Sequence, residues 1–293
     1  MIRNLFATKK MLADYAGQYA VDRNLGVEAA RQFRMSVRLL AKWHGKPVAL
    51  RDLSEKMLSD FLRDYAERVS PATVRNRRVA LLALWRQAAD DGLIRPPTRK
   101  IFKVTRRQQP VMAWRPAEVL QLIAAAQKLP RTHKCGLRRS EWFELAIRIA
   151  WDSALRWGDQ IQLDARIIQP DGSFSILQSK TQRIVTCHLS PSTMAMLADS
   201  LQRVPRRLAT PWHGSHETFN AQMRRLVAKA GIRPGSWKWL RRGSATDVEL
   251  RHPGSGAAHL GHVPGSRIAE QSYFDQTILQ REQNRPIELI GGG

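Results

Sequence analysis

Apolar residues recur at helical spacing through the first third of the chain. Four segments carry such a stripe: residues 11–19, 30–41, 57–65 and 74–88. Stripes of this period are typical of amphipathic helices that pack on a shared core. Ser54 and the Ser70-Pro71 pair stand where the third and fourth helices would be capped and started, and Gly92 stands where the fourth would end. The pattern predicts a small bundle of four helices.

The pattern changes in the rest of the chain. Helical spacing recurs in segments that start near residues 119, 142, 192 and 218. Between them, residues 172–177 and 184–189 alternate like two short strands, and the polar segment 178–183 joins them with Lys180 near its tip. This arrangement predicts a β-hairpin. The predicted fold class is therefore mainly α with a small antiparallel sheet (α+β).

A basic segment with prolines separates the two patterns. Residues 95–115 include Pro96, Pro97 and Pro110, and they carry seven Lys or Arg but no acid. Because prolines keep a linker extended, we expect a basic strap that lies across a phosphate backbone; a merely solvated linker is the alternative. The predicted organisation is a helical domain over 1–94, a linker over 95–115 and a larger domain over 116–293.

The net charge is the strongest bulk property of the chain. Forty-eight Lys and Arg face 25 Asp and Glu, which gives a formal net charge of +23. Such an excess repels itself unless a polyanion neutralises it, so nucleic acid is the expected partner. A basic surface that only aids solubility is the alternative interpretation.

Other bulk features exclude several classes of protein. No run of roughly 18 apolar residues is present, so no membrane span is expected, and the start of the chain is too polar for a signal peptide. Cys135 and Cys187 are far apart and form no CxxC pair. Neither a disulfide scaffold nor a structural metal site is therefore expected. We expect the protein to be cytoplasmic and associated with the nucleoid.

Tyr273 is the only tyrosine in the last two-thirds of the chain. On a basic chain it is a candidate oxygen nucleophile for a phosphodiester, because a phenol can form a covalent intermediate. Arg156 and Arg241 are candidates to hold the charge that develops on the phosphate oxygens. Lys180 on the hairpin tip is suited to protonate a leaving oxygen. His262 could hydrogen-bond the phosphate or take the phenol proton.

This ordered set resembles the tyrosine recombinases, a family that includes phage integrases. The matching motifs are Ala-Leu-Arg-Trp-Gly-Asp at 154–159 with Leu163, the hairpin Lys180, Lys-Trp-Leu-Arg-Arg-Gly-Ser-Ala-Thr at 238–246, and Leu-Gly-His at 260–262 followed by Tyr273. Asp159 stands where the family has Glu, three residues after Arg156, and we expect it to hold that guanidinium. Lys238 stands where the family has a histidine. His252 to Gly256 replace what is usually a more helical approach to Leu-Gly-His.

The resemblance implies a helical core-binding domain followed by a catalytic domain. It implies catalysis by Arg156, Lys180, Lys238, Arg241, His262 and Tyr273 through a 3′-phosphotyrosyl intermediate. Neither a cofactor nor a metal is expected. The implied partners are double-stranded DNA with specific recombination sites, three further copies of the chain in a tetramer, and accessory DNA-bending proteins. The implied role is mobile-element integration and excision. Expected DNA contacts are Arg99, Lys100, Lys103, Arg106, Arg107 and Arg242, and the apolar segment 286–290 is a candidate hook onto a neighbouring copy.

Two other functions stay open at this point. A DNA-binding protein that has lost catalysis would share the charge and the fold, and Lys238 is the residue that favours it. A type IB topoisomerase-like enzyme would share the phosphotyrosyl chemistry but relax DNA as a monomer. The brevity of the helical domain favours recombination over relaxation.

Overall fold

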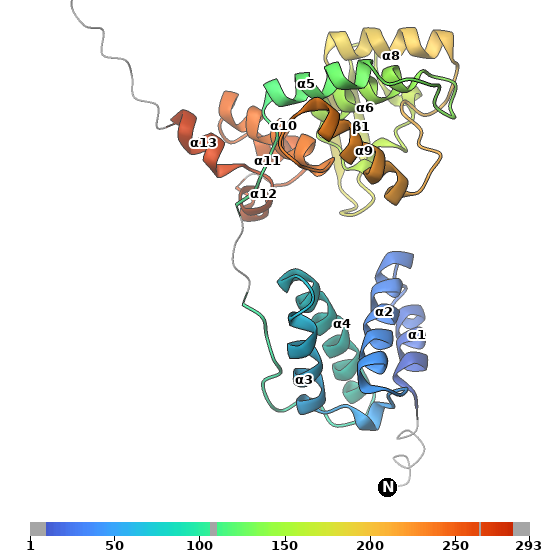
Figure 1. Ribbon diagram of the computed structural model, residues 1–293, viewed down its shortest axis with the longest axis vertical. Helices are drawn as coiled ribbons and strands as arrows, with labels where there is room; N and C mark the ends of the chain where they lie inside the picture. Colours follow the sequence, from blue (N-terminus) through green and yellow to red (C-terminus); the bar gives the residue numbers. More distant parts are fainter. Residues whose placement is uncertain (1–9, 106–109, 264, 284–293) are drawn as a thin grey trace, which may run out of the picture. The chain divides into compact units, whose positions relative to one another are not determined.

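The computed structural model describes residues 10–105, 110–263 and 265–283 of the 293-residue chain. The chain divides into two units, Met1–Gln108 and Gln109–Gly293, and each is described by itself (Figure 1). Among the described residues, no helix is both long and apolar enough to cross a bilayer.

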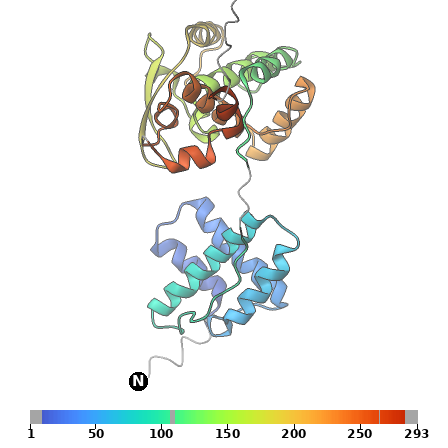
Figure 2. The same cartoon turned by 90° about the vertical axis from the view of Figure 1, so that its left-hand side faces the viewer.

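The described part of the first unit contains four α-helices, which Figure 2 shows packed side by side. They are α1 Leu12–Asp22, α2 Val27–His44, α3 Glu55–Ala66 and α4 Pro71–Asp90, with a short 3₁₀ turn at Leu50–Asp52. The expected caps are present: Ser54 Oγ accepts the Met57 N–H at 3.2 Å, and Ser70 Oγ accepts the Thr73 N–H at 3.3 Å. Each helix contributes fully buried side chains to one core, among them Leu12, Leu40, Phe61 and Leu84. The predicted four-helix bundle is confirmed.

Residues 95–105 are attached to the first unit. The Trp85 indole N–H donates to the Arg95 carbonyl at 2.8 Å, and the Phe102 N–H donates to Ser59 Oγ at 3.1 Å. Ile101 is 5% exposed in the core of the same unit. The part of the expected strap that the structure describes before residue 106 therefore packs on the helices.

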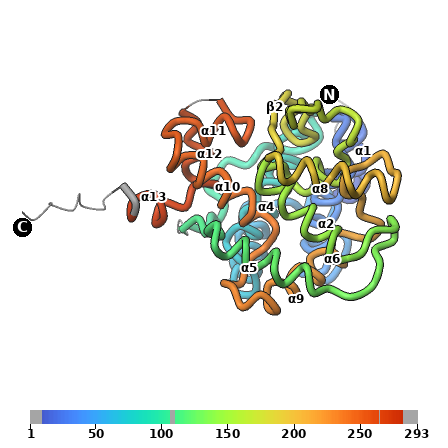
Figure 3. Tube along the Cα trace, turned by 90° about the horizontal axis from the view of Figure 1, so that it is seen from above, coloured from blue at the N-terminus to red at the C-terminus, as the bar shows by residue number. Residues whose placement is uncertain are grey.

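The second unit is built around α6. Its elements are α5 Pro116–Gln127, α6 Arg139–Ser153, α7 Trp157–Gln160, a 3₁₀ turn Ala165–Ile167, β1 Ser173–Leu177, β2 Ile184–His188, α8 Pro191–Arg203, α9 His216–Ala230, α10 Lys238–Arg251, α11 Gly256–His259, α12 Arg267–Ser272 and α13 Gln276–Gln283. Helix α6 packs against α5, α8, α10 and β2, and eight of its fifteen residues are buried. Helices α10 to α13 gather at one side of the unit (Figures 1 and 3).

The two strands pair as an antiparallel hairpin, as predicted. Phe174 is opposite Cys187 in the register, and these two side chains are buried together with Val185. Lys180 lies in the turn between the strands. The mainly helical class with one small antiparallel sheet is therefore confirmed.

Helix α10 crosses the rest of the second unit at a glycine. A Cβ at Gly243 would lie 2.2 Å from the Trp114 carbonyl oxygen and 2.9 Å from Trp151 Cζ3. Gly243→Ala is therefore expected to destabilise the second unit by about 1–3 kcal/mol through overpacking. Urea unfolding monitored by tryptophan fluorescence measures this change.

Gly17 in α1 is the matched control, because a Cβ there would meet no heavy atom within 4 Å. Gly17→Ala is expected to stabilise the first unit by about 0.5–1 kcal/mol, since alanine loses less backbone entropy in a helix. If Gly243→Ala unfolds at the same urea concentration as the unaltered chain, the close crossing of α10 is wrong.

Candidate active site

A buried arginine joins three segments of the second unit. Arg241 on α10 is 3% exposed, and its guanidinium donates to the carbonyl oxygens of Ala154 and Leu260, the latter at 2.9 Å. Ala154 ends α6 in the left-handed region, at φ +48°, which is uncommon for a residue with a Cβ. Burial, and then the nearby charge of Arg156, lower the pKa of Arg241 to about 10. Arg241 therefore stays charged at neutral pH.

Arg156 lies at the start of α7 and is partly exposed. Its Nη1 donates to Gln178 Oε1 at 2.5 Å and lies 4.0 Å from Asp159 Oδ2. The expected pairing of Asp159 with Arg156 is present as an ion pair at this distance. The other oxygen of Asp159, Oδ1, accepts from the backbone and hydroxyl of Ser179 at 3.0 and 2.6 Å. Asp159 thus fixes the turn that carries Lys180.

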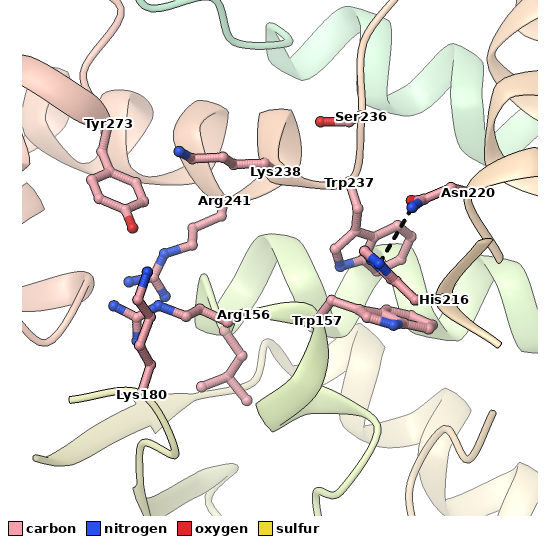
Figure 4. A pocket seen from close by; sticks show the side chains of 11 residues that line it. Arg156, Trp157, Lys180, His216, Asn220, Ser236, Trp237, Lys238, Arg241 and Tyr273 are labelled. Carbon is pink, nitrogen blue, oxygen red and sulfur yellow. Dashed lines mark hydrogen bonds between the residues drawn. The ribbon is translucent and has the colours of Figure 1, made fainter. Parts of the chain in front are cut away.

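Tyr273 follows α12 and lies among cations. The Arg241 guanidinium carbon is 5.0 Å from the centre of its ring, and Lys238 Nζ is 5.2 Å away. Figure 4 shows the hydroxyl turned toward the guanidinium groups of Arg241 and Arg156. Burial alone would raise the pKa of Tyr273, but the charges of Arg241, Arg156 and Lys238 outweigh it, so the pKa is lowered. The surroundings favour the phenolate.

Two further predicted residues lie beside this phenol. Lys238 opens α10, and burial of its ammonium followed by the charge of Arg242 lowers its pKa. His262 places its ring centre 5.4 Å from that of Tyr273. Its buried Nε2 has no hydrogen-bond partner among the described residues, and burial, followed by the charge of Arg241, lowers its pKa. An imidazole in this setting is neutral at pH 7 and can accept a proton.

One cavity of about 420 Å³ collects these groups (Figure 4). Its lining includes five of the six predicted catalytic residues: Arg156, Lys180, Lys238, Arg241 and Tyr273. The sixth, His262, contacts Tyr273 from the side. The rest of the lining was not expected from the sequence: Leu155, Trp157, His216, Asn220, Ser236 and Trp237. Gln178, which the sequence also did not single out, lies directly behind Arg156.

The expected DNA contacts lie in different places. Arg99, Lys100 and Lys103 are exposed on the segment attached to the first unit, whereas Arg106 and Arg107, like the hook at 286–290, lie outside the described residues. Arg242 is half-buried and donates to the carbonyls of Ser272 and Met112 at 3.1 and 3.2 Å, so it contacts the residue before Tyr273.

Metal ligands are not grouped in this unit. Over residues 10–105, 110–263 and 265–283, no three His, Cys, Asp or Glu side chains lie close enough together to hold an ion.

Solved structures share this fold over nearly the whole chain. A lambda integrase dimer bound to a COC′ core site aligns with a TM-score of 0.71 at 18% identity, covering 98% of this chain and 82% of that one. The XerH site-specific recombinase in its post-cleavage complex gives 0.69 at 18%, covering 92% and 83%. The Tn1549 transposon integrase gives 0.65 at 12%, covering 94% and 99%. No protein-family model and no curated protein sequence matches. The chain has the tyrosine-recombinase fold, as the resemblance implied.

The charges around Tyr273 lead to a titration experiment. Phenolate absorbance, taken as the difference between the unaltered chain and Tyr273→Phe, is expected to develop below the usual tyrosine pKa of about 10, because the nearby cations favour the anion. Arg156→Ala removes one of these cations and should move the titration to higher pH. A Tyr273 that titrates at or above pH 10 in the unaltered chain would contradict this description of the site.

Proposed function

We propose that this chain is a site-specific DNA recombinase that cuts and rejoins strands through a 3′-phosphotyrosyl intermediate. The observation that carries the proposal is the Tyr273 phenol, turned toward two guanidinium groups in a cavity with two lysines. A phosphodiester is the anion that such a cavity fits, because two arginine forks can bind its non-bridging oxygens while the phenol faces phosphorus.

The proposed cleavage exchanges one phosphorus–oxygen bond for another. Tyr273 Oη forms a bond to phosphorus, the bond from phosphorus to the 5′-oxygen breaks, and the phosphate stays on the 3′ end as a tyrosyl ester. The phenol proton passes to the neutral His262, whose Nε2 is unpartnered among the described residues. Lys180 protonates the leaving 5′-oxygen from the hairpin turn. The reverse reaction with a partner strand's 5′-hydroxyl restores the phosphodiester and needs no external energy source.

Fixed charge supplies the remaining catalysis in this proposal. Arg156 and Arg241 stabilise the charge that spreads over the non-bridging oxygens, and their positions need no rearrangement during the reaction. Lys238 donates to one of those oxygens from the start of α10, in the place where the family has a histidine. Its lowered pKa reflects the crowding of cations, and a bound phosphate anion relieves that crowding.

The partner proposed for the chain is double-stranded DNA. The formal net charge of +23 and the exposed Arg99, Lys100 and Lys103 support phosphate contacts from both units. A tetramer on two recombination sites is proposed by analogy with the lambda integrase tetramer on a Holliday junction, which aligns with a TM-score of 0.72 at 18% identity and covers 94% of this chain and 78% of that one. Integration and excision of a mobile element are the proposed biological role.

A suicide substrate tests the covalent step. DNA that carries the recombination site and a nick just 3′ of the scissile phosphate loses, on cleavage, the short fragment that carries the new 5′-hydroxyl, so the tyrosyl ester accumulates. The unaltered chain is expected to give a denaturant-resistant protein–DNA adduct, and Tyr273→Phe none, with DNA binding retained. An adduct from Tyr273→Phe would overturn the assignment of the nucleophile. DNA binding without any adduct from the unaltered chain would favour the binding protein that has lost catalysis.

The role of Lys180 is tested by changing the leaving group. Lys180→Ala is expected to slow cleavage of an ordinary phosphodiester by about 10²–10⁴-fold, the usual contribution of a general acid. A substrate with sulfur in place of the bridging 5′-oxygen leaves as a thiolate and needs no proton, so Lys180→Ala should cleave it nearly as fast as the unaltered chain does. An equal loss on both substrates would exclude Lys180 as the acid.

A further inference from the structure

Gln178 is a buried amide whose two ends are both engaged. It follows β1 and is 1% exposed. Its Oε1 accepts from Arg156 Nη1 at 2.5 Å and from Thr181 Oγ1 at 2.8 Å. Its Nε2 donates to the Leu260 carbonyl oxygen at 3.3 Å. One side chain therefore contacts a phosphate-binding arginine, the turn that carries Lys180 and the segment that leads to His262.

These bonds close a circuit around the two arginines. The Leu260 carbonyl that accepts from Gln178 also accepts from Arg241 Nη2 at 2.9 Å. The other terminal nitrogen of Arg241, Nη1, donates to the Ala154 carbonyl. Ala154 is two residues before Arg156. The circuit runs from Arg156 through Gln178, Leu260 and Arg241 back to the chain that carries Arg156. A closed circuit of this kind fixes the separation of the two guanidinium groups.

A glycine allows the Leu260 carbonyl to lie close to Gln178 and the hairpin. Gly261 has φ +70°, and a Cβ there would lie 3.0 Å from Gln178 Nε2 and 2.2 Å from Val185 Cγ2. Any other residue at this position would push the Leu260 carbonyl away from the hairpin. The bond between Gln178 and Leu260 is thus part of how α11 and the hairpin fit together.

We propose that Gln178 is a positioning residue that sets the spacing of Arg156 and Arg241 for the scissile phosphate and couples that spacing to the Lys180 turn. The inference rests on the proposed function, because it assigns Gln178 an effect on the phosphate-binding arginines of that reaction. Gln178 does not touch the phosphate; it acts through Arg156.

The circuit requires an amide in particular. One end of the side chain must accept from a guanidinium, and the other must donate to a carbonyl, which among side chains of this length only glutamine does. Glutamate would keep the contact with Arg156 but direct a second oxygen at the Leu260 carbonyl. It would also neutralise part of the charge that Arg156 offers to a phosphate.

The test compares two buried glutamines on two substrates. Gln178→Met removes both bonds at similar volume. Gln160→Met is the matched control, since the Gln160 side chain is also fully buried and donates to the Ala146 carbonyl at 2.8 Å, and its one bond to Arg156 is made by the backbone N–H, which the substitution keeps. Single-turnover cleavage is measured on a phosphodiester and on a methylphosphonate, in which a methyl group replaces one charged non-bridging oxygen. Binding of the same DNA is measured in parallel.

Gln178→Met is expected to slow phosphodiester cleavage on the order of 10²-fold with DNA binding retained, because small errors in the placement of a catalytic group cost rates of this order. On the methylphosphonate, the ratio between the cleavage rates of the unaltered chain and of Gln178→Met should be about tenfold smaller, since less charge is left for the arginines to stabilise. Gln160→Met should show no such difference between substrates. Gln178→Glu should slow phosphodiester cleavage too, and it carries the same comparison if Gln178→Met does not fold.

Two results would overturn the inference. If Gln178→Met cleaves the phosphodiester at the rate of the unaltered chain, the circuit of hydrogen bonds is dispensable. A loss of equal size on both substrates shows a general structural role without an effect on the arginines. Failure of the unaltered chain to form any adduct would instead refute the proposed function, so the two ideas fail in different ways.

Discussion

The site depends on one buried guanidinium. Arg241 is almost fully buried, and a buried charge without partners costs several kcal/mol. Two backbone carbonyls, those of Ala154 and Leu260, accept from its terminal nitrogens, while its Nε has no partner among the described residues. These two bonds tie the end of α6 and the loop before His262 to α10. Ala154, whose carbonyl accepts from this arginine, is in the left-handed region at φ +48°, which is a strained conformation for a residue with a Cβ.

The concentration of positive charge explains the chemistry of the cavity. Lys238, Arg241 and His262 all have pKa values lowered by burial and by neighbouring cations, whereas the same cations lower the pKa of Tyr273 in favour of its anion. The empty cavity is thus electrostatically costly, and an anion inside it relieves the repulsion. In the proposed reaction, these charges, which are already in place, stabilise a phosphodiester beside Tyr273 and the charge that develops in its transition state.

The secondary-structure elements could be predicted from local sequence rules. The residues that could not be predicted make their contacts with segments far away in the sequence. The caps at Ser54 and Ser70 and the hairpin around Lys180 follow from neighbouring residues, so the fold class could be predicted. The site residues came from an ordered set of motifs, and the structure brings Arg156, Lys180, Lys238, Arg241 and Tyr273 into one cavity. Gln178 could not be found in this way, because its partner Leu260 is 82 residues away. The contacts of Asp159 with Ser179 and of Arg242 with Ser272 could not be predicted, because they depend on the tertiary fold.

The central claim is that Tyr273 becomes covalently joined to a DNA 3′ end. The most direct measurement is mass spectrometry of the nuclease- and protease-digested complex formed on nicked site DNA. One modified peptide is expected, with a nucleotide joined through its 3′-phosphate to Tyr273, and a free 5′-hydroxyl is expected on the released fragment. A nucleotide on any other residue, or a 5′-phosphate on the modified peptide, would contradict this claim.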